Sequence, residues 1–149
     1  MTRINLIPVS ELSDQHLLAE YRELPRVIKQ EHIYIGDSPD KYTLGKGHIK
    51  WAVTHGTFCM YRYYLICEEM KYRGFTVNYP HEDLEKLADE KQIYMYSKPY
   101  TPTPEDIELS RNRIIEKLKQ KPDWYRWTNR ENERKLIWKK HLQNIQLTK

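Results

Sequence analysis

The spacing of apolar residues predicts a long helix near the N-terminus, over residues 14–30. Apolar side chains recur there at steps of three and four residues, which is typical of a helix with one buried stripe. Ser10 or Ser13 can cap the start of this helix, and Pro25 inside it is expected to kink it. The stripe consists of Leu17, Tyr21, Leu24 and Ile28.

Two more helices are predicted from the residues at their ends. One is expected over residues 57–73, because Gly74 stands where many helices end in a left-handed glycine. The other is expected from Pro104 to Gln120. Thr103 is its N-cap, and Pro104 takes the first helical position, where the missing N–H of proline does no harm.

The remaining segments are interpreted as loops and minor helices. Residues 31–47 carry several turn-forming residues, and residues 75–103 are interrupted by prolines. A short helix over 82–91 fits the pattern, and residues 128–149 can continue as a charged helix. Neither an internal repeat nor a strand ladder is evident. The sequence therefore predicts an all-α fold that forms a compact single domain.

Length and composition fit one globular domain. The chain has 149 residues, of which 39% are hydrophobic and 31% are charged, so we expect a sizeable core rather than a disordered chain. No apolar run approaches the roughly 20 residues of a membrane helix, and no signal peptide is expected. Cys59 and Cys67 lie eight residues apart, about 12 Å along a helix, which is too far for a disulfide. We expect two partly buried free thiols in a reducing compartment.

Positive charge and aromatic side chains concentrate in the C-terminal third of the chain. The formal net charge is +4, and residues 104–149 hold 12 Lys and Arg against 7 Asp and Glu. Cations pair with phosphates and rings stack on bases, so this composition is typical of nucleic-acid binding. It is also typical of a solvated helix with a packed edge, and composition alone does not separate the two. The aromatic residues are Trp124, Tyr125, Trp127 and Trp138.

Two residues of the N-terminal region are candidates for catalysis. Thr2 follows the initiator Met1, and a small second residue favours removal of that methionine. An exposed α-amine has a pKa of about 7.7–8.0, so part of it is a free-base nucleophile at neutral pH. Glu23 stands on the polar face of the first predicted helix, among arginines and a histidine. Ordinary ion pairs along a helix would explain that pattern equally well.

Several segments match a known family in order and in register. They are MTRINL, VSEL, DQHLLAEYRELPRV, LGKGH (44–48), RGF (73–75) and SRNRIIEKLKQKPDWYRW (110–127). Together they resemble the pyrimidine-dimer DNA glycosylase/AP lyase family, which includes endonuclease V of the T-even phages. The resemblance is near-identical over residues 1–27 and strong again around KPDWY, and it is weaker between them.

The resemblance implies a fold and a set of site residues. The family fold is a compact single domain of about three main helices with long loops, in which the N-terminus threads between helices to reach Glu23. The α-amine of Thr2 would attack the sugar of the 5′ base of the dimer, and Glu23 would be the essential carboxylate. The DNA-binding residues would be Arg3, Gln15, His16, Arg22, Arg26, Arg113, Lys117, Trp124, Tyr125, Arg126 and Trp127.

The resemblance also implies an activity. The family excises the 5′ base of a cyclobutane pyrimidine dimer through a Schiff base and then breaks the strand by β-elimination. The implied partner is double-stranded DNA with ultraviolet lesions, bound by a monomer that needs no cofactor, metal, membrane or obligate protein partner. Such a protein would work in the cytoplasm, on the nucleoid. The same imine chemistry on another lesion, or DNA binding without catalysis, remains open at this point.

The sequence departs from the family in two regions. The loop after Arg26 is shorter and lacks a cluster of basic residues, which removes phosphate contacts. Residues 1–127 are expected to form the glycosylase/lyase-like domain, and residues 128–149 a basic C-terminal extension. We hypothesise that cations of this extension replace the missing basic loop. They are Arg130, Arg134, Lys135, Lys139 and Lys140.

Two weaker signals are given an ordinary interpretation. Three histidines, His48, His55 and His81, accompany the two cysteines, but their spacing does not resemble a zinc site. The segment Gly45–His48 has glycines around a lysine without the full phosphate-loop frame, so we expect a turn there.

Overall fold

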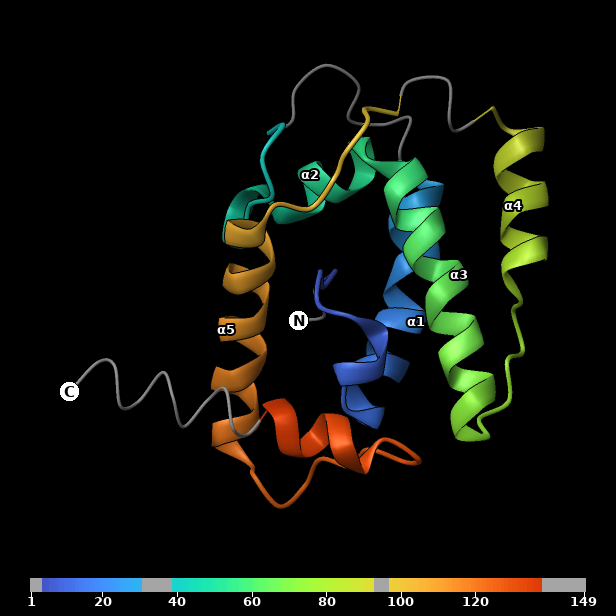
Figure 1. The fold of residues 1–149 in the computed structure, drawn as a ribbon. Coiled ribbons are helices and arrows are strands. Elements are labelled where there is room, and N and C mark those ends of the chain that lie inside the picture. The colour runs from blue at the N-terminus through green and yellow to red at the C-terminus, as the bar shows by residue number, and fades with distance from the viewer. Residues whose placement is uncertain (1–3, 31–38, 93–96, 138–149) are drawn as a thin grey trace.

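The structure is a computed structural model that describes residues 4–30, 39–92 and 97–137. Helices form nearly all of its regular structure, and no strand occurs in these ranges, which confirms the all-α prediction. The helices are α1 (Asp14–Lys29), α2 (His48–Thr54), α3 (Gly56–Arg73), α4 (His81–Glu90) and α5 (Pro104–Gln120), with 3-10 turns η1 (Val9–Glu11) and η3 (Gly45–Gly47). Residues 131–137 are also helical. Figure 1 shows α5 on one side of the molecule and the α1–α3 pair on the other.

Helix α1 begins and ends close to where the apolar spacing predicts. Ser13, and not Ser10, is its N-cap, because the Ser13 hydroxyl accepts a hydrogen bond from the His16 N–H at 3.1 Å. The helix continues through Pro25 to Lys29, and the kink at that proline stays a prediction. Of the predicted stripe, Leu17, Leu24 and Ile28 are fully buried and Tyr21 is half-buried.

The ends of α3 and α5 follow the predicted signals. Gly74 ends α3 in the left-handed region at φ 89°, where a side chain would be strained. The Thr103 hydroxyl accepts a hydrogen bond from the Asp106 N–H at 3.1 Å, and Pro104 is the first residue of α5. The short predicted helix over 82–91 is also confirmed, one residue earlier, as α4.

Two expectations need correction. Helix α2 was not predicted, because it is short and begins after Gly47, whose side chain offers no cap. Cys59 and Cys67 are free but fully buried rather than partly buried. They lie on α3, which packs against α1, α2 and α4, so residues around most of its circumference are inside.

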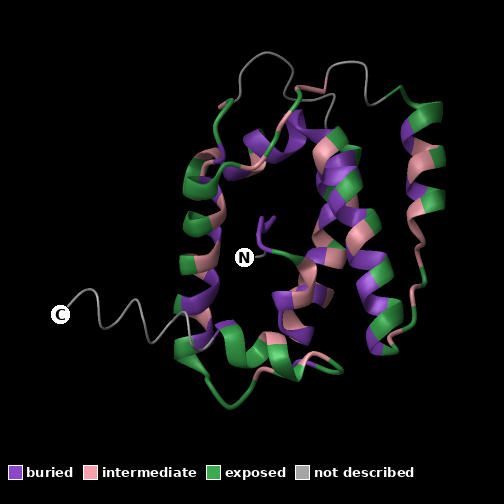
Figure 2. Ribbon diagram, in the orientation of Figure 1, coloured by how far each residue is buried: buried purple, intermediate pink, exposed green. Residues whose placement is uncertain are grey.

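The N-terminal segment, residues 4–7, lies at the centre of the molecule. Figure 1 shows it between α5 and α1, and Figure 2 shows it buried. Ile4 and Ile7 are completely inaccessible to solvent. The core is therefore assembled around a non-helical segment of the chain, and not only between helix faces. This central position decides where the first residues of the chain can lead.

Candidate active site

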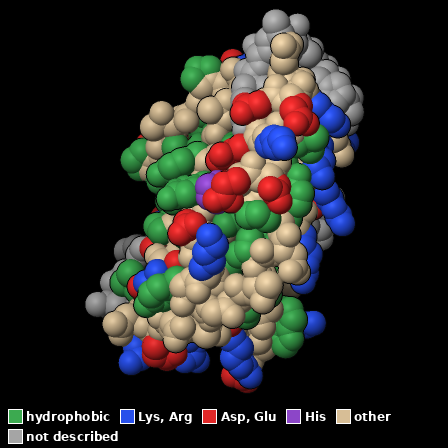
Figure 3. Space-filling model, turned by 90° about the vertical axis from the view of Figure 1, so that its right-hand side faces the viewer, with side chains coloured by type: hydrophobic (Ala, Val, Ile, Leu, Met, Phe, Trp, Pro, Cys, Tyr) green, Lys and Arg blue, Asp and Glu red, His purple; other side chains and the backbone are tan. Residues whose placement is uncertain are grey.

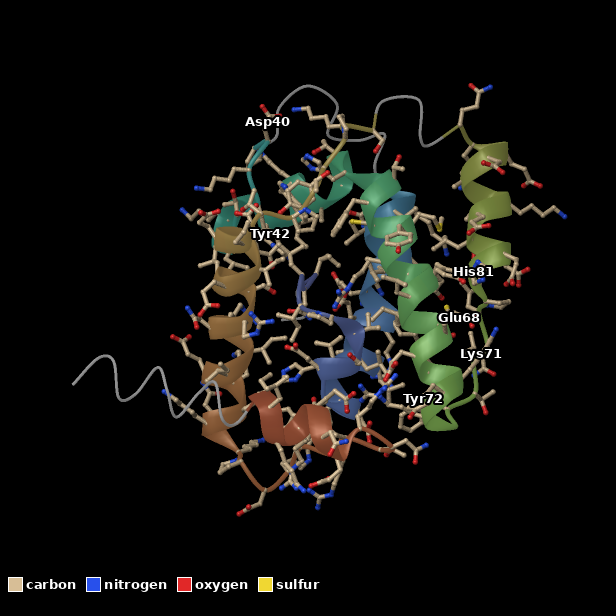
Figure 4. The ribbon with its side chains drawn as sticks, viewed as in Figure 1. Asp40, Tyr42, Glu68, Lys71, Tyr72 and His81 are labelled. Carbon is tan, nitrogen blue, oxygen red and sulfur yellow. The ribbon has the colours of Figure 1, made fainter. Side chains whose placement is uncertain are left out.

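Hydrogen bonds to three parts of the fold hold the backbone of the N-terminal segment. The Ile4 N–H donates to Nε2 of His48 on α2, at 2.9 Å. The Tyr42 hydroxyl donates to the Ile4 carbonyl at 2.7 Å, from a side chain that Figure 4 shows between α2 and α5. The Leu6 N–H donates to the Ser110 hydroxyl on α5 at 2.9 Å. These hydrogen bonds pair backbone groups that would otherwise be buried without partners, and they fix the segment in one position.

A buried ion pair fixes the same segment through a side chain. Asn5 donates to Oε1 of Glu20 on α1 at 2.9 Å. The Glu20 carboxylate also accepts two bonds from Arg62 on α3, at 2.7 and 3.2 Å. Arg62 donates a further bond to the Ile7 carbonyl. Both charges are paired and hydrogen-bonded, which is the condition under which buried ions are tolerated.

His48 acts as a neutral hydrogen-bond acceptor. Its Nε2 accepts from Ile4, so its proton is on Nδ1, which donates to the Thr43 carbonyl at 2.9 Å. Both ring nitrogens are thus used in positioning the backbone. No group of three or more metal-ligating side chains occurs among the described residues.

The candidate carboxylate Glu23 follows Glu20 on α1 by three residues. Glu23 is half-buried, whereas Arg22 and Arg26 beside it are exposed. The carboxylate therefore lies where the buried face of α1 meets its charged outer face. Thr2 and Arg3 lie outside the described residues.

His16 joins α1 to the aromatic segment, residues 124–127. Its Nδ1 lies 2.8 Å from the Ser13 hydroxyl, and its ring stacks on Tyr125 with centroids 4.9 Å apart. Burial, together with the positive charges of Arg113 and Lys117 on α5, lowers the pKa of His16 to about 4. The ring is therefore neutral at pH 7. Two of the predicted DNA-binding residues, His16 and Tyr125, thus stack on each other, and two more, Arg113 and Lys117, act on His16 through their charge.

Gln15 holds the backbone of the aromatic segment. Its amide nitrogen donates to the Trp124 carbonyl at 2.7 Å, and its amide oxygen accepts from the Arg126 N–H at 3.1 Å. The Asp14 N–H donates to the Arg126 carbonyl at 2.6 Å. The first turn of α1 thus fixes the aromatic segment, although the two are more than 100 residues apart in the chain.

The members of the aromatic segment have different surroundings. Trp127 is 5% exposed and its indole N–H donates to the Glu11 carbonyl at 2.9 Å, so it belongs to the core. The Arg126 guanidinium donates to carbonyls of its own loop, at Asp123 and Tyr125. Trp124 is 54% exposed. Trp124 is thus the most exposed of these rings, and the Lys121 amine lies over its ring, 5.5 Å from the centroid.

A comparison with known families identifies the family to which this chain belongs. The family model described as pyrimidine dimer DNA glycosylase matches residues 1–83, more than half of the chain. The protein belongs to the pyrimidine dimer DNA glycosylase family. The matched part contains the central N-terminal segment and helices α1, α2 and α3. This DNA repair glycosylase therefore has DNA with pyrimidine dimers as its substrate.

The charges on the surface of this glycosylase are unevenly distributed. Figure 3 shows the face over α3 and α4, where acidic side chains gather and Lys and Arg side chains lie along one edge. On α4, Glu82, Asp83, Asp89 and Glu90 are exposed, against a single exposed lysine, Lys86. This face repels a polyanion, so DNA is expected elsewhere on the molecule. In the described part of the chain, no helix is long and apolar enough to cross a membrane.

Sequence reasoning did not find the residues that position the N-terminal segment of the glycosylase. They are Tyr42, His48, Glu20, Arg62 and Ser110. One signal was available. Glu20 is a carboxylate between the apolar positions of α1, which indicates a buried partner. The partner itself, Arg62, is 42 residues away and has no local signature.

Proposed function

We propose that the protein is a bifunctional glycosylase and AP lyase that acts through the α-amine of Thr2. It releases the 5′ base of a cyclobutane pyrimidine dimer from its sugar and then breaks the strand. The observation that carries this proposal is the buried N-terminal segment, which Glu20 holds beside α1, three residues before Glu23 on the same helix.

The geometry leaves the amine within reach of Glu23. Asn5 contacts Glu20, and Glu23 is three residues further along α1, a rise of about 4.5 Å. From Asn5, three residues of extended chain span about 10 Å and lead to Thr2. The amine and the carboxylate can therefore face the same sugar once Met1 has been removed.

The first step is substitution at the sugar. The unprotonated amine attacks C1′, the C1′–N bond to the 5′ base breaks, and the base leaves with the bonding electrons and takes up a proton. The sugar ring then opens: the C1′–O4′ bond breaks and O4′ takes up one proton from the attached nitrogen, which leaves a protonated imine between Thr2 and C1′. The Glu23 carboxylate stabilises positive charge that develops on the sugar in the transition state.

The second step is β-elimination. The iminium makes the C2′ proton acidic, and Glu23 accepts that proton as general base. The electrons form the C2′–C3′ double bond while the C3′–O bond breaks and the 3′ phosphate leaves. Water then hydrolyses the imine and restores the amine. An amine and a carboxylate supply both steps, so the chemistry requires no metal or cofactor.

The DNA is held by the cations beside these groups. Arg22 and Arg26 are exposed on α1, and Arg113 and Lys117 on α5 lie near enough to His16 to lower its pKa by their charge. We assign them to phosphates, together with Arg3. Trp124 stacks on an unpaired base, whereas Gln15, His16 and Tyr125 support the segment that carries it. A damaged pair costs the least to open, which favours the lesion.

The substitution Glu23→Gln tests the proposal directly. It keeps the shape and removes the base, so we expect strand cleavage at a dimer to fall at least 100-fold while binding to dimer DNA is retained. Cleavage of a duplex with one site-specific dimer, together with its binding isotherm, measures both. Glu116→Gln, at an exposed position on α5, is the matched control. Undiminished cleavage by the Glu23 variant would overturn the role of this carboxylate.

A further inference from the structure

The C-terminal extension is attached to the body of the protein by a buried charge network. Arg130 Nε and Nη2 donate to the two carboxylate oxygens of Glu69 on α3, each at 2.8 Å. The guanidinium also lies over the Tyr72 ring, 4.0 Å from its centroid. Figure 4 shows Tyr72 at the end of α3, beside the chain that follows the aromatic segment. Arg130 is thus held by two parallel hydrogen bonds and a ring face.

The network continues from Glu69 to the start of α1. Glu69 is 5% exposed and also accepts a bond from Arg73 at 2.8 Å. Arg73 donates in turn to Asp14 at 2.9 Å. The Asp14 carboxylate accepts the Thr128 hydroxyl at 2.6 Å and the Thr128 N–H at 3.1 Å. Arg130 and Thr128 are therefore both fixed, and they directly follow the aromatic segment in the chain.

These contacts leave Arg130 occupied. Burial raises the pKa of Glu69, but the hydrogen bonds from Arg130 and Arg73 outweigh it, so the pKa of Glu69 is lowered and the carboxylate is ionised. Arg134 also has a carboxylate partner, Glu131, at 2.8 Å. The expectation that the extension replaces a basic loop thus does not fit Arg130. Its charge is neutralised inside the protein, where it releases no counterions from DNA.

We propose that Arg130 and Glu69 form a clamp that positions Trp124 for lesion recognition. The clamp holds the C-terminal side of the aromatic segment, while Gln15 and Asp14 hold the segment itself. Fixing the loop on both sides lowers the entropy cost of presenting one exposed indole to the DNA. Arg130 and Glu69 are positioning residues, because they act on the DNA through Trp124. This inference rests on the proposed role of Trp124 in the dimer glycosylase.

The variant Arg130→Lys tests the clamp without removing a charge. A lysine cannot make two parallel bonds, so we expect the KM for dimer DNA to rise about tenfold, the scale of a lost base–aromatic stack. The maximal rate on an abasic-site duplex should not change. Binding to undamaged DNA should keep its salt dependence. Glu69→Gln should reproduce the effect, and Lys71→Gln, which breaks an exposed ion pair with Glu68 on the same helix, should not.

A double-mutant cycle separates positioning from general stability. In a Trp124→Ala background, Arg130→Lys should have no further effect on the KM, because the residue that it positions is gone. An equal effect in both backgrounds would overturn the proposal. A second contradicting result would be a wild-type KM for Arg130→Lys together with a slope of log K against log salt that is less steep by about 0.9 in Arg130→Met. That pattern indicates a phosphate contact.

The same assay distinguishes failure of the clamp from failure of the proposed function. If the wild-type protein cleaves dimer DNA and Arg130→Lys is indistinguishable from it, the clamp is wrong and the chemistry stands. If the wild-type protein excises no base from dimer DNA, the proposed function is wrong. In that case, an unchanged affinity of Arg130→Lys for dimer DNA would also overturn the clamp. A loss of affinity that is absent in the Trp124→Ala background would support it.

Discussion

At the scale of single residues, His16 is held in its neutral form where the first turn of α1 meets the aromatic segment. Burial and the charges of Arg113 and Lys117 lower its pKa from 6.5 to about 4. The neutral ring shares a hydrogen bond with the Ser13 hydroxyl and stacks on Tyr125, and it adds no positive charge to its surroundings. The family resemblance predicts His16 as a DNA contact. Its surroundings add a structural role that sequence spacing could not reveal.

The lowered pKa predicts how folding stability depends on pH. His16 binds a proton near pH 6.5 in the unfolded chain and only near pH 4 in the folded protein. Its contribution to the free energy of unfolding is therefore complete above pH 6.5 and is lost as the pH falls toward 4. The loss should be about 3 kcal/mol. Asn can keep the bond to Ser13 but does not titrate. Urea unfolding of the wild type and His16→Asn across this range measures the difference, and a constant difference would contradict the assigned cause.

At the scale of elements, local signals predict helices well and contacts between them poorly. Helices α1, α3 and α5 carry caps or a terminal glycine that act within a few residues, and all three are found near their predicted bounds. Helix α2 has no such cap and was missed. The bonds from Gln15 to the aromatic segment and from Glu20 to Arg62 join distant parts of the chain. No periodicity encodes them, because they arise only when the helices pack.

The opposite charges of two helix surfaces lead to a prediction about DNA binding. Arg26 is exposed on α1, on the side assigned to phosphates, whereas Lys86 is exposed on the acidic helix α4. Arg26→Gln should make the slope of log K against log salt for undamaged duplex less steep by about 0.9, the value for one phosphate contact. Lys86→Gln removes the same charge and should leave the slope unchanged. Equal slopes for the two variants would show that the binding face is assigned incorrectly.

At the scale of the whole molecule, the fold is organised around its own N-terminal segment. Helices α1, α2, α3 and α5 each contribute a side chain that binds residues 4–7. The resemblance implies a threaded N-terminus, and the structure adds the residues that hold it. An extended segment in the core has no apolar periodicity of its own, so its partners could not be predicted from the sequence. The proposed mechanism needs a well-positioned amine, and the fixed position of residues 4–7 supports that proposal.

Reductive trapping of the imine shows whether the Thr2 amine is the nucleophile. Untagged protein, shown by intact mass to begin at Thr2, is mixed with a duplex that carries one thymine dimer and treated with borohydride. The proposed mechanism gives a covalent protein–DNA adduct that peptide mapping assigns to the Thr2 amine. An adduct on a lysine, or no adduct with either a dimer or an abasic duplex, would contradict it.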